Sequence, residues 1–456
     1  MSIPLLAYLL FSWIRIIFLF PVNPDGGCYL SVTERLSDGL RPYVDISMNY
    51  PPVSYYYYLI FRELIGGGDI IYRFALLTIE AASSFVLALI TKRLFKSTVV
   101  SVFSGILFLF FYLAYDGPWF VMEPFVNLFS LAAVFFLLNS SKAGALASGA
   151  CLLLSVMSKQ YGVLVLPSLL LLIFRKQDGF DVKTGLLRGL LLCGGFLLTA
   201  LVMFQLLHID VAIFISKISG HGYEKEGILK MLSALFSTRG LWFIVVLILP
   251  VVVLLRKFDF NLFIFTFLCL CHTAPLYVRT YPHYFQLLLP YGIILLIYAA
   301  VKFFFEETST GNFKKVTAAA LILTLTGPAA AALYVPARYA MSFKDKREIA
   351  VTAQKINTVV GQRSAALVIN EPQFWYLCNL YPPTHEEGYH VVYKSGDYGN
   401  PFKYNMADIP FVLWFDGDTI ALDDPQLTGY LMLTHKKTAV LHFHGGKRTV
   451  EIWDRK

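Results

Sequence analysis

Charged residues are scarce in this sequence. Only 15% of its 456 residues are Asp, Glu, Lys or Arg, whereas 57% are hydrophobic. A soluble domain cannot cover so much apolar surface with so few polar side chains, which excludes an ordinary soluble protein. The composition therefore predicts a polytopic α-helical membrane protein.

Cysteine motifs and glycine-rich nucleotide-binding loops are also missing. The six cysteines are scattered, and no CxxC or His/Cys spacing indicates a zinc site. A bridge between Cys28 and Cys378 is not expected, because nothing in the sequence brings two such distant residues together. No P-loop or dinucleotide-binding glycine pattern occurs, so no nucleotide site is expected. No cofactor is indicated, and the residues leave a requirement for a divalent cation open.

Apolar stretches recur along the chain as far as residue 336. Crossing a hydrocarbon core takes about 20 apolar residues, and roughly eleven stretches approach this length. The first has no basic amino-terminal region and no small-residue cleavage site, so we expect a retained span rather than a removable signal peptide. The predicted spans cover residues 3–22, 69–92, 97–115, 118–138, 143–157, 160–176, 184–207, 239–256, 260–277, 283–305 and 315–336.

Lysine and arginine gather in alternate connections between these spans, as they do on the cytoplasmic side of membrane proteins. With the amino terminus inside, this rule places the first loop, residues 23–68, and everything after residue 337 outside the cytoplasm. The net charge of +8 thus reflects membrane topology, since no basic stripe with interleaved aromatics indicates nucleic-acid binding. The residues predicted to be cytoplasmic are Lys92, Arg93, Lys96, Lys142, Arg175, Lys176, Lys183, Arg256, Lys257, Lys302, Lys314 and Lys315.

The composition becomes polar at Pro336-Ala337-Arg338. The chain therefore divides into a membrane domain, residues 1–337, and a small extracytoplasmic α/β domain, residues 338–456. His435, His442 and His444 lie near one another in the predicted sheet, but without an acidic or Cys partner we expect polar strand residues rather than metal ligands. The predicted elements are helices over Lys344–Val360 and Pro372–Leu380 and strands over Ala365–Ile369, Phe411–Phe415, Tyr430–Leu433, Thr438–Phe443 and Thr449–Trp453, the last two forming a hairpin around Gly445-Gly446.

Ionisable residues at the ends of spans mark candidate functional sites, because burying them in a membrane is costly. The predicted topology places five of them, from five distant segments, at the outer face: Asp25, Glu123, Lys159, Arg279 and His283. Structural alternatives are that Asp25 caps a helix, that Asp45 fixes a turn, that Glu123 only pairs with Lys159, that Lys159 and Arg279 reach lipid headgroups, and that His283 is a hydrogen-bonded interfacial histidine.

These residues stand in motifs that resemble the GT-C superfamily of integral-membrane glycosyltransferases, in the branch of protein O-mannosyltransferases and lipid A aminoarabinose transferases. The resemblance covers roughly the first 300 residues. The sequence differs from many members of this family at the first loop. They carry an acidic pair there, whereas this chain has Asp25 followed by Gly26. The matching pieces are Asp25-Gly26-Gly27-Cys28-Tyr29, Gly39-Leu40-Arg41-Pro42-Tyr43-Val44-Asp45, Pro51-Pro52, Glu123-Pro124, Ser158-Lys159-Gln160-Tyr161-Gly162 and His283-Tyr284-Phe285-Gln286-Leu287-Leu288-Leu289-Pro290.

The resemblance implies inverting transfer of a sugar from a polyprenyl-phosphate carrier to a hydroxyl of a glycan, lipid or protein acceptor at the outer face of the cytoplasmic membrane. Asp25 would be the general base. The remaining candidates would bind substrate, the cations by meeting the charge of the leaving phosphate. The alternatives are a surface-polysaccharide polymerase or ligase, a lipid-linked sugar transporter, or an inactive scaffold. The substrate-binding candidates are Asp45, Glu123, Lys159, Arg279, His283 and Tyr284.

Overall fold

The structure is a computed structural model. It describes residues 22–46, 48, 50–176, 179–219, 226–256, 258–304, 311–369, 371, 373–380, 410–415, 431–443 and 448–456. The predicted first span lies outside these residues apart from Val22, and so do His444 and the turn at Gly445-Gly446.

The chain forms two compact units. The described parts of residues 74–208 and 219–338 make up unit 1, and those of residues 22–73, 209–218 and 339–456 make up unit 2. The first predicted loop is therefore grouped with the residues after 338. The helices α4 and α16 each contribute residues to both units.

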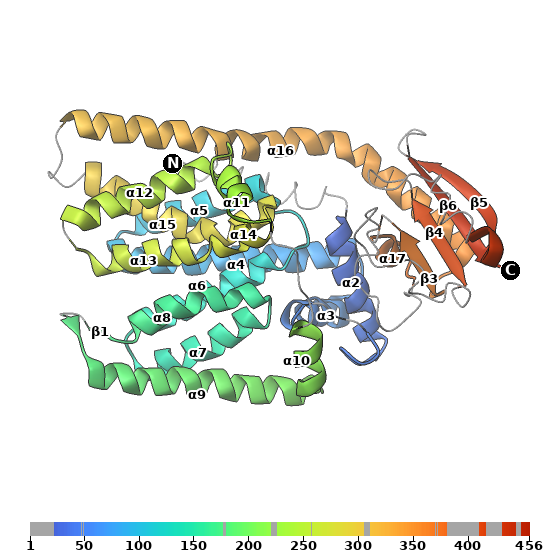
Figure 1. Cartoon of the computed structure of the whole chain (residues 1–456), viewed down its shortest axis with the longest axis horizontal. Helices are drawn as coiled ribbons and strands as arrows, with labels where there is room; N and C mark the ends of the chain where they lie inside the picture. The colour runs from blue at the N-terminus through green and yellow to red at the C-terminus, as the bar shows by residue number, and fades with distance from the viewer. Residues whose placement is uncertain are drawn as a thin grey trace. The chain divides into compact units, whose positions relative to one another are not determined.

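Unit 1 is built from helices and one short antiparallel hairpin, β1 (Arg175–Lys176) with β2 (Gly179–Phe180) (Figure 1). Among the described residues, five helical stretches are long and apolar enough to cross a membrane: Asp69–Phe95, Thr98–Tyr115, Val182–Leu206, Phe260–Val278 and Pro282–Val301. Three more, Glu123–Leu138, Lys142–Val156 and Gln160–Leu172, are apolar but shorter. The helices are α4 (Asp69–Phe95), α5 (Thr98–Tyr112), η1 (Leu113–Tyr115), α6 (Glu123–Leu138), α7 (Lys142–Val156), η2 (Gln160–Val165), α8 (Leu166–Leu172), α9 (Val182–Leu206), α11 (Ile228–Leu235), α12 (Leu241–Arg256), α13 (Phe260–Cys271), α14 (Ala274–Val278), η3 (Pro282–Tyr284), α15 (Phe285–Phe304) and the first part of α16 (Gly311–Val360).

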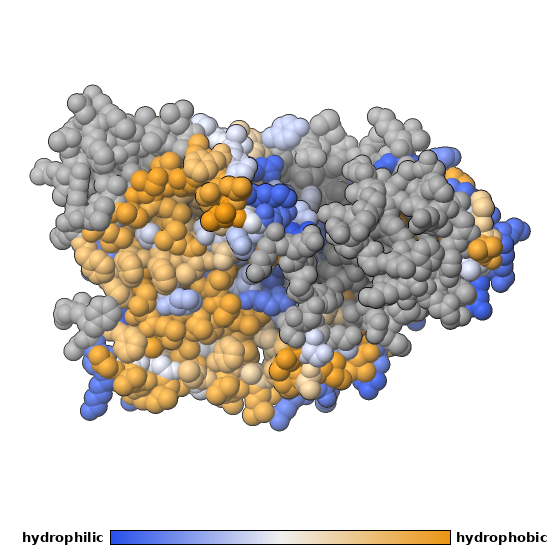
Figure 2. All heavy atoms as spheres, viewed as in Figure 1, coloured by the Kyte–Doolittle hydropathy of each residue, from blue (hydrophilic) through white to orange (hydrophobic). Residues whose placement is uncertain are grey.

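Hydrophobic side chains cover much of the visible surface of this unit, over the helices that Figure 1 labels α7, α9 and α13 (Figure 2). On α9 the exposed residues include Leu190 and Leu197, which are 72% and 66% accessible. So much accessible apolar area is stable only against lipid. The surface therefore agrees with the predicted polytopic helical membrane fold.

Local capping signals explain why several helices begin where the sequence predicts. Ser97, Ser141 and Asp181 precede α5, α7 and α9, and each side chain accepts a hydrogen bond from the backbone N–H three residues later. The predicted span 118–138 is shorter than expected, because α6 starts only at Glu123. Asp116 has a left-handed backbone (φ 56°) that ends η1, and residues 118–122 are not helical. Glu123 thus lies at the first residue of a helix.

α15 is the central helix of unit 1. It packs against α5, α6, α12 and α13, and 89% of its most apolar stretch is buried. A second contact, between α7 and α9, depends on glycine. A Cβ on Gly195 would lie 2.0 Å from the carbonyl oxygen of Leu146, and one on Gly149 would lie 1.9 Å from that of Leu192. The two backbones therefore approach each other more closely than any side chain allows.

Gly195→Ala should destabilise the protein, and Gly194→Ala should not. At position 195 the new methyl group meets backbone, whereas at position 194 its nearest neighbour is a Leu146 methyl group at 4.0 Å. We expect Gly195→Ala to cost about 1–3 kcal/mol, as overpacking does. Thermal unfolding in detergent would measure this, and equal melting temperatures for the two variants would contradict the packing described for α7 and α9.

Unit 2 contains a four-stranded mixed sheet in the order β3-β4-β6-β5, in which only β3 and β4 are parallel. Its helices are α2 (Pro24–Ser37), α3 (Val53–Ile65), α10 (Val211–Ser219), α17 (Gln373–Leu377) and the last part of α16. The strands are β3 (Ala366–Ile369), β4 (Phe411–Phe415), β5 (His435–Phe443) and β6 (Arg448–Arg455).

Two predicted elements of this region are wrong. Residues 431–434 are helical rather than a strand, because a short apolar run is compatible with either state. The helix predicted from Lys344 does not start there, since α16 runs without interruption from Gly311 to Val360. Residues 337–343 contain neither proline nor glycine, so no helix-breaking residue separates the two predicted helices and they form one.

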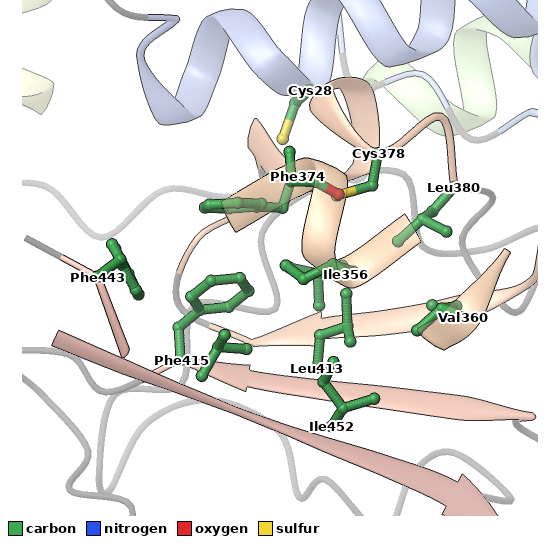
Figure 3. Close-up of a cluster of buried hydrophobic side chains, with 14 residues drawn as sticks. Cys28, Ile356, Val360, Phe374, Cys378, Leu380, Leu413, Phe415, Phe443 and Ile452 are labelled. Atoms are coloured by element: carbon green, nitrogen blue, oxygen red, sulfur yellow. The ribbon is translucent and has the colours of Figure 1, made fainter. Parts of the chain in front are cut away.

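The core of unit 2 joins the start of α2 to the carboxy-terminal sheet (Figure 3). Gly27 allows this, because a Cβ there would lie 2.2 Å from Cα of Gln373 in α17. The next residue, Cys28, enters the same buried cluster as Cys378, Phe374 and strands β4 and β6. Both cysteines are free thiols, and burial raises the pKa of the Cys378 thiol. A stretch predicted to be an extracytoplasmic loop is thus part of a folded core.

Candidate active site

A buried ion pair forms the centre of the candidate site in unit 1. Lys159 Nζ donates a hydrogen bond to Glu123 Oε1 at 2.6 Å, and the two side chains are only 4% and 0% exposed. Glu123 begins α6, and Lys159 lies between the end of α7 and η2. Desolvating two charges is costly, so the pair persists only because its geometry is good. The pairing of Glu123 with Lys159 that the sequence suggested is therefore present.

Two tyrosines cover the ammonium group of this pair. Lys159 Nζ lies 4.8 Å from the ring centroid of Tyr284 and 5.6 Å from that of Tyr161. The two rings meet edge to face at 5.5 Å. The face of an aromatic ring attracts a cation, most strongly where water is excluded. Tyr284, a predicted substrate-binding residue, therefore helps to hold Lys159 in place.

His283 joins this cluster from η3. Its ring packs on Tyr284 with centroids 4.7 Å apart, and its Nδ1 lies 3.9 Å from Asp116 Oδ2. That distance is too long for a hydrogen bond, and Nδ1 has no hydrogen-bond partner among the described residues. The structure thus brings Glu123, Lys159, His283 and Tyr284 together and adds Asp116, to which the sequence analysis assigned no role.

Arg279 lies at the edge of this cluster. Its Nη1 donates to the hydroxyl of Tyr281 at 3.1 Å, and the ring of Tyr281 stacks on that of His283 at 5.5 Å. The guanidinium group is only partly buried. Arg279 is therefore positioned near the buried ion pair but is not part of it.

A buried hydrogen-bond network beneath the cluster fixes the ends of four helices. Gln286, in the first turn of α15, accepts from Tyr112 Oη at 2.7 Å and donates through Nε2 to the Tyr115 carbonyl oxygen at 2.6 Å. Asn127 of α6 donates to the Gln286 carbonyl oxygen at 2.9 Å, and Trp242 of α12 donates to Tyr115 Oη at 2.6 Å. Because every bond is buried, movement of one helix end would leave polar groups unpaired.

Glu226 ties the connection before α11 to the segment after α14. Its Oε2 accepts hydrogen bonds from the Thr280 N–H at 3.1 Å and the Thr280 hydroxyl at 2.6 Å. These bonds, with the nearby charges of Lys230 and Arg279, lower the pKa of the Glu226 carboxyl group. The carboxylate is therefore ionised at neutral pH, and the contact weakens only as the pH falls through that lowered pKa.

Asp25 and Asp45 both lie in unit 2. Asp25 is half-buried in the first turn of α2, whose N-cap residue is Asn23, so the cap role considered for Asp25 is wrong. An acid in the first turn still interacts favourably with the helix dipole. Asp45 accepts three hydrogen bonds from Arg41, at 2.9, 2.8 and 2.9 Å, and so closes the turn around Tyr43 (φ 63°). This geometry favours the structural alternative for Asp45.

The structure describes His435 and His442 of the carboxy-terminal sheet, and each contacts a different threonine. His435 is buried beside Thr434, and His442 is exposed beside Thr449. No group of His, Cys, Asp or Glu in the described part of the chain is placed to hold a metal ion.

Comparison with solved structures identifies the fold of this chain. No protein-family model and no curated protein matches the sequence. Among solved structures, ArnT from Cupriavidus metallidurans in the apo state is similar, with 14% sequence identity, a TM-score of 0.65, and coverage of 98% of this chain and 96% of that chain. The same protein bound to undecaprenyl phosphate gives 12% identity, a TM-score of 0.60, and coverage of 98% and 97%.

A third similar structure is the oligosaccharyltransferase AglB from Archaeoglobus fulgidus, in complex with an inhibitory peptide and a dolichol-phosphate. It has 11% identity and a TM-score of 0.51, with 90% of this chain and 69% of that chain covered. The chain thus shares its fold with these proteins, which are members of the GT-C superfamily. The fold resemblance is confirmed and extends beyond the first 300 residues, since the ArnT match covers nearly the whole chain.

Proposed function

We propose that this protein is a glycosyltransferase that moves a sugar from a polyprenyl-phosphate carrier to a hydroxyl acceptor at the outer face of the cytoplasmic membrane. The observation that carries the proposal is the GT-C fold over 98% of the chain, matched to a structure that is bound to undecaprenyl phosphate. The carboxy-terminal residues lie outside the cytoplasm in this scheme, as the distribution of basic residues predicts.

The reaction needs a base for the attacking hydroxyl and charge stabilisation for the leaving group. The acceptor oxygen attacks the anomeric carbon, its proton passes to the Asp25 carboxylate, and the bond from that carbon to the phosphate oxygen breaks. Attack from the face opposite the phosphate inverts the anomeric configuration. The products are the glycosylated acceptor and the polyprenyl phosphate, whose charge must be met by fixed donors.

The contacts in unit 1 suggest separate roles for the cationic candidates. Glu123 already neutralises Lys159 at 2.6 Å, so we assign Lys159 to holding the Tyr284 ring in place. Arg279 is only partly buried, and His283 Nδ1 lies 3.9 Å from Asp116 Oδ2, too far for a hydrogen bond, so these two residues are the better candidates for the phosphate. Tyr284 and Glu123 would shape the sugar pocket, and Asp45 would support the loop that follows α2.

The proposal is tested by supplying the purified protein with radiolabelled polyprenyl-phosphate sugar and membrane extract. We expect the label to leave the carrier and to appear once in each acceptor molecule. Label built into a growing polymer would indicate a polymerase, and label that crosses the membrane while still on its carrier would indicate a transporter. Label that stays on the carrier in every extract would mean that the protein is not a transferase.

A further inference from the structure

Helix α17, in the carboxy-terminal part of unit 2, packs directly on α2, the helix that carries Asp25. The contact is closest at Gly27, where a Cβ would lie 2.2 Å from Cα and 2.5 Å from Cβ of Gln373. No side chain fits between the two helices at this point, so their backbones meet. The first turn of α2 is therefore held by a segment from the other end of the chain.

Cys28 anchors the same part of α2 in the hydrophobic core of the carboxy-terminal domain. Its side chain is 1% exposed and belongs to the buried cluster that also contains Phe374 and Phe415. Figure 3 shows Cys28 pointing from α2 into this cluster, on the side where Phe374 lies. The rings of Phe374 and Phe415 stack with centroids 4.4 Å apart, which connects α17 to β4. The start of α2 is thus fixed to the carboxy-terminal sheet through α17.

A second contact holds the other end of α2. Glu34, in the third turn of this helix, accepts hydrogen bonds from the Tyr72 hydroxyl and from Arg62 Nε, the latter at 2.7 Å. The ring of Tyr72 meets that of Tyr376 in α17 edge to face, with centroids 6.0 Å apart. α17 therefore contacts α2 directly at Gly27 and is linked to Glu34 through Tyr72. Two separate points of contact fix the rotation of a helix as well as its position.

Asp25 lies on the side of α2 away from α17. Successive side chains of an α-helix are rotated by about 100°, so residues two apart point in nearly opposite directions. Gly27 faces Gln373, and the half-buried Asp25, two residues earlier, faces away from α17. α17 thus supports the helix on the face opposite to the carboxylate.

We infer that the carboxy-terminal domain positions the general base, and that Gln373 and Phe374 of α17 are positioning residues. The inference rests on the proposed function, in which Asp25 takes the proton of the attacking hydroxyl. A misplacement of a reacting group by about 1 Å costs about 10²-fold in rate, even when the altered residue is far from the chemistry. Contacts that fix the first turn of α2 therefore set kcat. Donor binding is assigned to residues of unit 1 and should not change.

Two variants alter this contact, and a third is their control. Gly27→Ala places a methyl group against the backbone of α17, and Phe374→Leu removes a ring that is 1% exposed. Ile452→Val trims a side chain that is 0% exposed in the same cluster, on the far side from Cys28 (Figure 3). All three are made in the full-length protein and compared at equal amounts of folded protein, as judged by thermal unfolding.

Kinetic constants separate positioning from a loss of folded protein. The substrate is the polyprenyl-phosphate sugar that the wild type transfers. We expect kcat to fall about tenfold in Phe374→Leu and about hundredfold in Gly27→Ala, with KM for the donor unchanged. Ile452→Val should keep both constants. Equal turnover by Phe374→Leu and Ile452→Val would overturn the inference, and so would a loss that lies entirely in the donor KM. If Gly27→Ala did not fold, Phe374→Leu would decide.

Hydrogen exchange tests the same contact without sugar transfer. The backbone amides of α2 around Cys28 should exchange faster in Phe374→Leu than in the wild type or in Ile452→Val, because contact with α17 protects this turn. Unchanged exchange there would overturn the inference. If Asp25→Asn retained full turnover, the proposed base would be wrong, and the positioning role would fall with it. If Asp25→Asn lost turnover while Phe374→Leu matched Ile452→Val in both assays, only the inference would be wrong.

Discussion

Asp25→Asn is expected to reduce sugar transfer by about 10²–10⁴-fold, the usual contribution of a general base. Asparagine has nearly the same shape as aspartate but cannot take the proton of the attacking hydroxyl. The structure suggests that folding would be little affected, because Asn23 is the N-cap of α2 and Asp25 occupies only its first turn. Loss of the favourable charge at the helix start costs about 0.3–1 kcal/mol.

The measurement is initial-rate transfer of labelled sugar from a polyprenyl-phosphate donor, with thermal unfolding of the same preparations. Asp38→Asn is a matched control at the other end of α2. Asp38 lies 3.2 Å from Arg363, in a contact whose arginine side chain is 63% exposed, and it should tolerate the change in both assays. Near-normal turnover of a folded Asp25→Asn protein would show that another group removes the proton.

Helix positions in unit 1 were predictable because their signals are local. A Ser or Asp directly before an apolar run marks the residue at which a helix begins. Ser97, Ser141 and Asp181 stand in such positions, and they do cap α5, α7 and α9. The pairing of Glu123 with Lys159 was also within reach, since both residues sit at the ends of apolar runs near each other in sequence. Where a local signal is ambiguous, as in the short apolar run at residues 431–434, the prediction fails.

Contacts between distant segments were not predictable. Nothing in the sequence around Gln286 indicates that its amide joins Tyr112 and Tyr115, which lie more than 170 residues away. The close approach of Gly27 to Gln373 is likewise a property of packing, although two adjacent glycines could have suggested a tight contact. Nothing in the sequence indicates that Lys230 and Arg239 line one cavity, because that cavity exists only once α11 lies beside α14.

Lys159→Met should be among the most destabilising single changes in unit 1. It would leave the Glu123 carboxylate, 0% exposed, without its cation, and breaking a buried pair in this way costs about 3–5 kcal/mol. We expect a large fall in melting temperature and in the yield of folded protein. Arg279→Met, at the partly buried edge of the cluster, is the control and should unfold close to the wild-type temperature.

The double variant Lys159→Met with Glu123→Gln separates stability from function. Removing both charges eliminates the uncompensated carboxylate, so most of the lost stability should return. Transfer should not return, because the ammonium group that holds the Tyr284 ring at 4.8 Å is still missing. If the double variant recovered turnover together with stability, the pair would be a structural contact only, and the site would have to be sought among the remaining residues. If the single variant were as stable as the wild type, the pair would not be buried as described.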